Sequence, residues 1–297
     1  VKTPPQEEDD RVRTTIYGRR CVIFHKADSG SEPVFYGKSN SNVDKGGEEV
    51  FGFTHSEYSS IAQSVEFCNN DILACKFHAP IPDVWESAFE FRYPDGHKDI
   101  SDFKIMHDWV VSTWQEGASG NVLNETYIGT DGTQYTNDTA EYRLAKFKKE
   151  FTEHFDFDFC LIYYLYTFVI LMVDQRAKNM FLTTFDGTHW FPIPYDMDTA
   201  IGINNEGDLV FEYDIEDTDK VNNENVFTGQ DSALWHNVRD AFPSRRFKMY
   251  DELRRREDIP FSFEYISKKM NDHQTTWPEA IWNEDAKVIN MANQFFG

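Results

Sequence analysis

The 297-residue sequence has few cysteines, little positive charge and no apolar run long enough to cross a membrane. Its four cysteines form no Cys-x-x-Cys pair and have no histidines clustered near them, which argues against a zinc site or a disulfide framework. We expect reduced, mostly buried thiols. The longest apolar run, 159–173, has fifteen residues, three of them tyrosines. A membrane-spanning helix needs about 20 residues, so a buried helix is the better interpretation.

Positive charge is scarce because 51 Asp and Glu residues face 29 Lys and Arg residues, which gives a net charge of −22 and a pI near 4.7. This acidity argues against a nucleic-acid-binding surface and against binding to an anionic membrane. It favours solubility and cation binding. The length suits one large domain or two small ones. Because the chain begins with Val1, we expect a cleaved product or a piece of something longer.

Two short segments look like ligand-binding loops, but each lacks a required glycine. Gly37-Lys38-Ser39 has Glu32 where a phosphate-binding loop needs its first glycine. Within the acidic insert 204–220, Asp217-Thr218-Asp219 lacks the glycine of a calcium loop. We expect neither to bind its ligand, and we interpret 209–213 as part of a solvated acidic hairpin.

The first third of the chain has a β pattern. Residues 1–12 are rich in proline and acids and are expected to be an extended surface segment. Two strands are predicted around the turn Asp28-Ser29-Gly30, followed by a polar loop at 37–49. The predicted strands are 21–25, 34–36, 50–54, 64–67, 72–77 and 88–92.

From residue 101 the pattern becomes helical. Ser101 is the expected cap of the first helix, and Asp138 with Glu141 is the expected capping pair of the second, after a polar loop at 117–136. The residues predicted to face the core are Phe103, Met106, Val110 and Trp114 in the first helix, and Leu144, Phe147, Phe151 and Phe155 in the second. A solvated face is predicted for Lys146, Lys148 and Lys149. Later helices are expected near 231–241, 247–256, 262–271, after Trp277 and at the C-terminus.

The stretch 159–198 organises the rest of the chain. After the apolar helix come two strand-like runs, 180–184 and 189–193, joined by a segment that contains Asp186-Gly187. With these two residues at the centre of the turn, antiparallel pairing sets Asn179 opposite Pro194. Asp196 and Asp198 then follow within roughly 7 and 13 Å of extended chain.

Together with Asp174, these residues place three carboxylates and an amide at one end of the hairpin. Oxygen ligands of this kind hold divalent metals, and a carboxylate base beside a metal-bound phosphate is the arrangement of phosphoryl transfer. For each Asp taken singly, a capping or solvated turn residue is the alternative.

The segments 173–180 and 190–202 resemble the core of the spore-coat protein H-like kinase family, whose signature ends in Trp-x-x-Pro-aromatic-Asp-x-Asp. Through 195–200, 204–207 and 277–281 the chain is similar to bacteriophage virion proteins that carry this domain. The resemblance implies an α+β, two-lobed atypical protein-kinase-like fold. Its β-rich small lobe would be 13–100, and its helical large lobe 101–297 would carry the hairpin 180–193. An ordinary α+β domain is the alternative.

The resemblance also implies roles for four residues. Asp174 would be the catalytic base, Asn179 the metal-binding amide, and Asp196 the acid that holds Mg²⁺ under the phosphates of ATP. Asp198 would assist at the metal or brace the loop.

The family usually carries a nucleotide-pairing lysine on an upstream strand. Lys38 and Lys45 are the available substitutes, and neither lies on a predicted strand.

Three functions follow. The preferred one is a virion structural protein of the phage tail or neck apparatus, in contact with other virion proteins and with no nucleic-acid partner or membrane-spanning segment. The second is an active atypical Ser/Thr kinase that uses ATP and Mg²⁺. The third is a calcium-braced adhesin. The missing lysine and the start of the chain favour the first, and the retained Asp174, Asn179 and Asp196 favour the second.

Overall fold

The computed structural model describes residues 18–25, 29–30, 32, 34–42, 62–67, 71–94, 96–172, 175–176, 178–194, 232–256, 261–275 and 279. The chain forms two compact units, of which the first includes 53–249 and the second comprises 17–52 and 250–297. Helices and antiparallel strands are both present, which confirms the α+β class. The expected segments 1–12, 50–54 and 204–220 lie outside the described residues.

A four-stranded antiparallel sheet lies at the centre of the first unit, with the strand order β4-β3-β7-β8. Its strands are β3 (Gln63–Phe67), β4 (Phe89–Tyr93), β7 (Met180–Thr184) and β8 (Trp190–Pro194). Because β3 pairs with β7, strands from both sides of the expected lobe boundary at residue 100 share one sheet.

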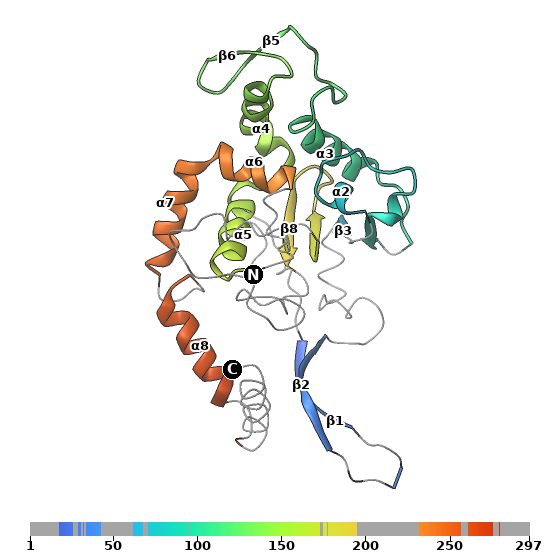
Figure 1. Cartoon of the computed structure of the whole chain (residues 1–297), viewed down its shortest axis with the longest axis vertical. Coiled ribbons are helices and arrows are strands. Elements are labelled where there is room, and N and C mark those ends of the chain that lie inside the picture. The colour runs from blue at the N-terminus through green and yellow to red at the C-terminus, as the bar shows by residue number, and fades with distance from the viewer. Residues whose placement is uncertain are drawn as a thin grey trace, which may run out of the picture. The chain divides into compact units, whose positions relative to one another are not determined.

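Helices cover both faces of this sheet. On one face, Phe103 of α3 (Ser101–Ser112) packs edge-on against Trp190, with ring centroids 5.6 Å apart. On the other, Phe159 of α5 (Phe157–Val169) packs edge-on against Phe191 at 5.5 Å. Successive strand residues point to opposite faces, so β8 contacts a different helix with each of these two side chains. Figure 1 shows the β7–β8 pair in yellow, with α5 on one side and α3 on the other.

Aromatic side chains join the remaining helices of the first unit. Phe151 of α4 (Ala140–His154) lies 5.4 Å from Phe242, which joins α6 (Ala233–Ala241) to α7 (Pro243–Arg254). Shorter elements are α2 (Ile72–Cys75), η1 (Trp85–Ser87), β5 (Thr126–Ile128) and β6 (Gln134–Thr136). The helices predicted from residue 101 to 256 are therefore confirmed.

The second unit contains the hairpin β1 (Gly18–His25) and β2 (Val34–Asn42), and the helix α8 (Phe263–Thr275). The hairpin confirms the prediction of two strands around Ser29-Gly30. The expected polar loop at 37–49 was wrong over its first six residues, because β2 continues to Asn42. Lys38 therefore lies on a strand, paired with Val22.

The strand predicted over 72–77 is instead the short helix α2. Asp71 caps it, because its Oδ1 accepts hydrogen bonds from the backbone N–H groups of Leu73 and Ala74 at 3.2 and 3.3 Å. Phe77 then adopts a left-handed φ of 59°. A short apolar run fits a strand or a buried helical turn equally well, and here the capping residue decides.

Two expected helix N-caps also differ from the structure by one residue, the first being predicted too late in the chain and the second too early. Ile100, not Ser101, occupies the N-cap position of α3, and the backbone N–H of Ser101 donates to Asp99 Oδ1 at 3.0 Å. Thr139, not Asp138, caps α4 by accepting from the N–H of Tyr142 at 3.2 Å. Asp138 is thereby released for other contacts. Cys75 and Cys160 are free and buried, as expected.

Candidate functional site

The register of the β7–β8 hairpin differs by one residue from the prediction. Met180 pairs with Pro194 and Thr184 with Trp190, so Pro194 does not lie opposite Asn179. The connection has five residues, 185–189, rather than a two-residue turn. A one-residue change of register moves each side chain relative to its cross-strand partner, so the expected pairing at this end of the hairpin was wrong.

The side chain of Asp186 explains the wider turn. Its Oδ1 accepts hydrogen bonds from the backbone N–H groups of Thr188 and His189, both at 2.8 Å. Its Oδ2 lies 2.7 Å from His189 Nδ1. These hydrogen bonds and the charge of His189 outweigh desolvation and lower the pKa of Asp186 to about 2. The Asp-Gly pair correctly predicted a hairpin, but the carboxylate set its width.

Of the four predicted site residues, the structure describes only Asn179. It is half-buried, lies directly before β7, and has a φ of 53°, a left-handed conformation that Asn tolerates. Asp174, Asp196 and Asp198 lie outside the described residues, so their metal and catalytic roles stay predictions. No group of three or more His, Cys, Asp or Glu side chains within the described ranges is placed to hold a metal ion.

The loop that carries Asn179 is fastened to the buried helix α5. Tyr163 donates a hydrogen bond from its hydroxyl to the Gln175 carbonyl oxygen at 2.5 Å. The Arg176 guanidinium lies 5.1 Å from the centre of the Tyr164 ring, and only 4% of the residue is exposed. Burial lowers the pKa of this arginine. Sequence reasoning missed this anchor, although two polar residues directly after an apolar helix were a usable signal.

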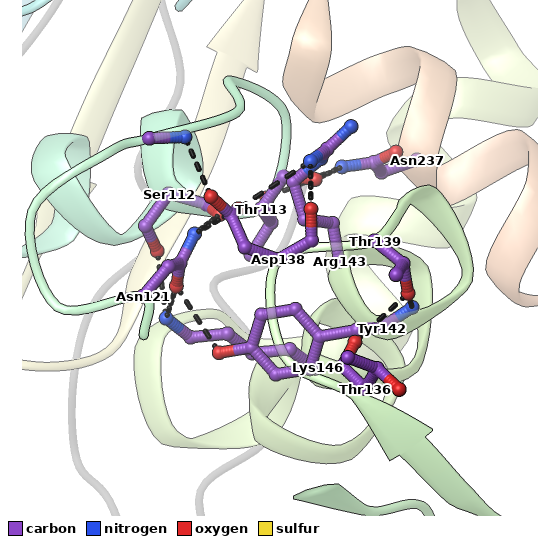
Figure 2. Close-up of polar contacts among 11 residues, drawn as sticks. Ser112, Thr113, Asn121, Thr136, Asp138, Thr139, Tyr142, Arg143, Lys146 and Asn237 are labelled. Atoms are coloured by element: carbon purple, nitrogen blue, oxygen red, sulfur yellow. Dashed lines mark hydrogen bonds and ion pairs between the residues drawn. The ribbon is translucent and has the colours of Figure 1, made fainter. Parts of the chain in front are cut away.

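A second set of polar contacts lies where α3 ends and α4 begins (Figure 2). Asp138 is 3% exposed and accepts hydrogen bonds from Gly117 N at 2.6 Å and Asn121 Nδ2 at 3.0 Å. Arg143 donates to the backbone oxygen of Asp138 at 2.7 Å and lies 3.4 Å from its carboxylate. A buried carboxylate satisfied in this way fixes the loop 117–121 against α4.

Lys146 belongs to the same cluster, so its predicted place on a solvated face was wrong. Its Nζ donates to Ser112 Oγ at 2.9 Å and to Asn121 Oδ1 at 3.0 Å. Burial lowers the pKa of Lys146. A serine beside such a lysine is a known nucleophilic pair. Here Ser112 is only 3% exposed and donates its hydroxyl proton to the Trp109 carbonyl at 2.7 Å, so the contact is structural.

A pocket of about 350 Å³ opens next to this cluster, between the end of α3, the start of α4 and α6. Asn237 lines this pocket and donates to Thr113 Oγ1 at 3.2 Å. Charged groups of both signs line the pocket, among them Arg143 and the pair His236–Asp240, whose atoms Nε2 and Oδ2 are 3.0 Å apart. Such a lining suits a small polar ligand without a strong preference for charge.

The described part of the chain has no helix that is both long enough and apolar enough to cross a bilayer. Comparison of the chain with protein-family models, with curated proteins and with solved structures found no match.

Proposed function

We propose that the chain is a structural component of a bacteriophage particle, in its tail or neck apparatus, built on a kinase-like core of the spore-coat protein H type. The observation that carries this proposal is the succession of the buried helix α5, the loop with Asn179 and the hairpin β7–β8. Protein kinases place their catalytic base, metal-binding Asn and metal-binding Asp along the same succession. The resemblance of 173–180 and 190–202 to that family supports it.

The electrostatics of the core favour a kinase-like fold that no longer binds ATP. ATP brings several negative charges, and the predicted site adds the carboxylates of Asp174, Asp196 and Asp198. Bringing them together requires compensating cations. The arginine of the loop, Arg176, is directed to the Tyr164 ring instead.

An active atypical kinase is the second candidate, and one observation favours it. Lys38 lies on strand β2, which is the kind of element that carries the nucleotide-pairing lysine in kinases. Lys45 lies outside the described residues. The wild-type chain would then transfer the γ-phosphate of ATP to a Ser or Thr hydroxyl, with Asp174 as base and Asn179, Asp196 and Asp198 at the metal.

Thermal unfolding with and without Mg²⁺ and ATP separates the two candidates. For a structural protein we expect the same Tm in both conditions, for the wild type and for Asp196→Ala. For a kinase, Mg²⁺ with ATP should raise the Tm of the wild type by several degrees, as ligand linkage requires. That rise should disappear in Asp196→Ala and remain in Asp131→Ala, a matched change in the exposed β5–β6 turn.

A separate experiment tests the proposed location of the protein in the tail or neck of the phage particle. Antibodies against the chain should label the tail or neck of purified particles in electron micrographs. Particles that contain no copies of the chain would contradict the structural role.

A further inference from the structure

Three arginines gather around one tyrosine of the buried helix α5. The ring of Tyr164 has the guanidinium carbon of Arg176 at 5.1 Å and that of Arg246, from α7, at 5.2 Å. Arg239, from α6, interacts electrostatically with the same tyrosine. Arg246 also donates to the Arg239 carbonyl oxygen at 2.8 Å, which ties two of the three together.

Within the described residues, Arg239 is the one of these arginines that forms an ion pair with a carboxylate. Arg239 binds both oxygens of Asp240, through Nε at 2.7 Å and Nη2 at 3.1 Å. Neither Arg176 nor Arg246 forms an ion pair within the described part of the chain. Asp240 also interacts electrostatically with Arg246. Arg176 is therefore the arginine of the three that no carboxylate of the described residues reaches.

The same two side chains also hold buried hydrogen-bond donors without acceptors. Nε and Nη1 of Arg176 and Nε of Arg246 are buried and have no hydrogen-bond partner. A buried guanidinium with unmet donors is costly, because it has lost its hydration and gained no partner. Bound water would accept hydrogen bonds from these donors but would not neutralise the positive charge of the guanidinium groups. An oxyanion satisfies both, because guanidinium groups pair with its oxygens in a fork geometry.

We propose that Arg176 and Arg246 form a binding site for a phosphoryl group beside Tyr164. A phosphoryl group is favoured over a carboxylate because its three terminal oxygens match the three unmet donors, Nε and Nη1 of Arg176 and Nε of Arg246, whereas a carboxylate has two oxygens. The site depends on the arginines alone and stands whether or not the kinase-like core binds metal and ATP.

Thermal unfolding of the full chain in metal-free buffer with a chelator tests the site. At equal ionic strength, roughly 10 mM inorganic phosphate should raise the Tm by about 2 °C or more over chloride, if binding is submillimolar. Acetate should have a much smaller effect. A phosphoserine peptide and metal-free ATP form two further arms and show whether the natural phosphoryl group belongs to a protein or to a nucleotide.

The variants Arg176→Gln and Arg246→Gln should each abolish most of the phosphate-dependent rise. Arg245→Gln is the matched control, because Arg245 lies on the same helix and pairs at the surface with Asp158. Arg246 is only half-buried, so Arg246→Gln is expected to fold even where Arg176→Gln does not.

Three results would overturn the proposal. The wild type could show no rise with phosphate, acetate could match phosphate, or all variants could keep the rise, which would indicate an adventitious ion only. Because no metal is present, these results are independent of Asp196 and of the Mg²⁺ and ATP experiment.

Discussion

At the scale of single residues, Asp138 accepts hydrogen bonds from the loop after α3 and from α4 in the cluster of Figure 2. It was expected to cap α4, but Thr139 takes that position, and Asp138 is left in a left-handed conformation with a φ of 62°. There its carboxylate accepts from the loop before β5 and lies beside a guanidinium. One residue therefore holds the loop after α3 against the start of α4.

We expect Asp138→Ala to destabilise the protein by about 3 kcal/mol, because it leaves the Gly117 N–H, the Asn121 amide and the Arg143 charge without their acceptor. Asp138→Asn keeps an acceptor and tolerates the left-handed backbone, so it should cost about 1 kcal/mol. Urea unfolding followed by fluorescence measures both. Equal losses for the two variants would show that the carboxylate is not the organising contact.

His107 is a second buried polar residue, and it has a different environment. It is fully buried, its ring stacks on Phe77 at 5.2 Å and meets Phe89 edge-on at 5.4 Å. Neither ring nitrogen has a hydrogen bond of normal geometry. Desolvation lowers the pKa of His107 to about 4, with the nearby Ala74 backbone and Asp108 opposing this and Lys104 adding to it.

This pKa predicts a loss of stability in acid. The folded-state value lies below the ordinary 6.5, so the unfolded chain binds the proton more tightly. The free energy of unfolding should be unaffected by His107 above pH 6.5 and should fall by about 3 kcal/mol between pH 6.5 and 4.

Urea unfolding from pH 7.5 to 4 on the wild type and on His107→Met provides the measurement. The fall attributable to His107 should be missing in the variant, whereas His97→Gln, a change outside the core, should keep it. A variant with the same pH profile as the wild type would contradict a buried neutral His107.

At the scale of elements, the five-residue turn between β7 and β8 fits against the first turn of α3. Gly187 has a φ of +79°, and a Cβ at this position would lie 2.8 Å from Asp102 Oδ2. That same oxygen accepts a hydrogen bond from Gln63 Nε2 at 2.5 Å. The turn, the helix and strand β3 therefore meet at one carboxylate, and glycine is needed both for the backbone and for the space.

Gly187→Ala should cost about 2–3 kcal/mol, of which about 1 comes from the backbone and the rest from displacing Asp102. Gly132→Ala separates the two causes, because Gly132 has the same φ of +79° and open space around its Cα. We expect it to lose only about 1 kcal/mol in urea unfolding. Equal losses at the two glycines would mean that Asp102 moves away without cost.

At the scale of the whole molecule, the pairing of β3 with β7 decides the architecture of the first unit. Ser64 lies opposite Thr183, with their hydroxyl oxygens 3.3 Å apart across 119 positions of sequence. No local pattern specifies which strand pairs with β3. Alternation of apolar and polar residues indicates only that a segment is a strand. The second compact unit likewise joins a segment of the N-terminal part, 17–52, to the C-terminal part, 250–297.

Much of the fold followed from local patterns. The helices with apolar residues three and four positions apart, the hairpin at Asp-Gly and the buried α5 all lie in their predicted segments. The candidate site was less predictable. Asn179 precedes β7 as expected, but the register at its end of the hairpin depends on how Asp186 folds its own turn. Lys146 and Arg176 could not be placed, because their partners belong to other elements.

The sequence by itself determined the helices between residues 101 and 256, the strands β3, β4, β7 and β8, and that the thiols Cys75 and Cys160 are buried, because periodicity and turn residues act over a few neighbouring positions. Only the tertiary structure decided which strands share a sheet and which charges are buried. Those outcomes depend on packing between residues far apart in the chain. Desolvation is set by that packing, and it turned Lys146 into a structural donor and left buried donors of two arginines beside Tyr164 without acceptors.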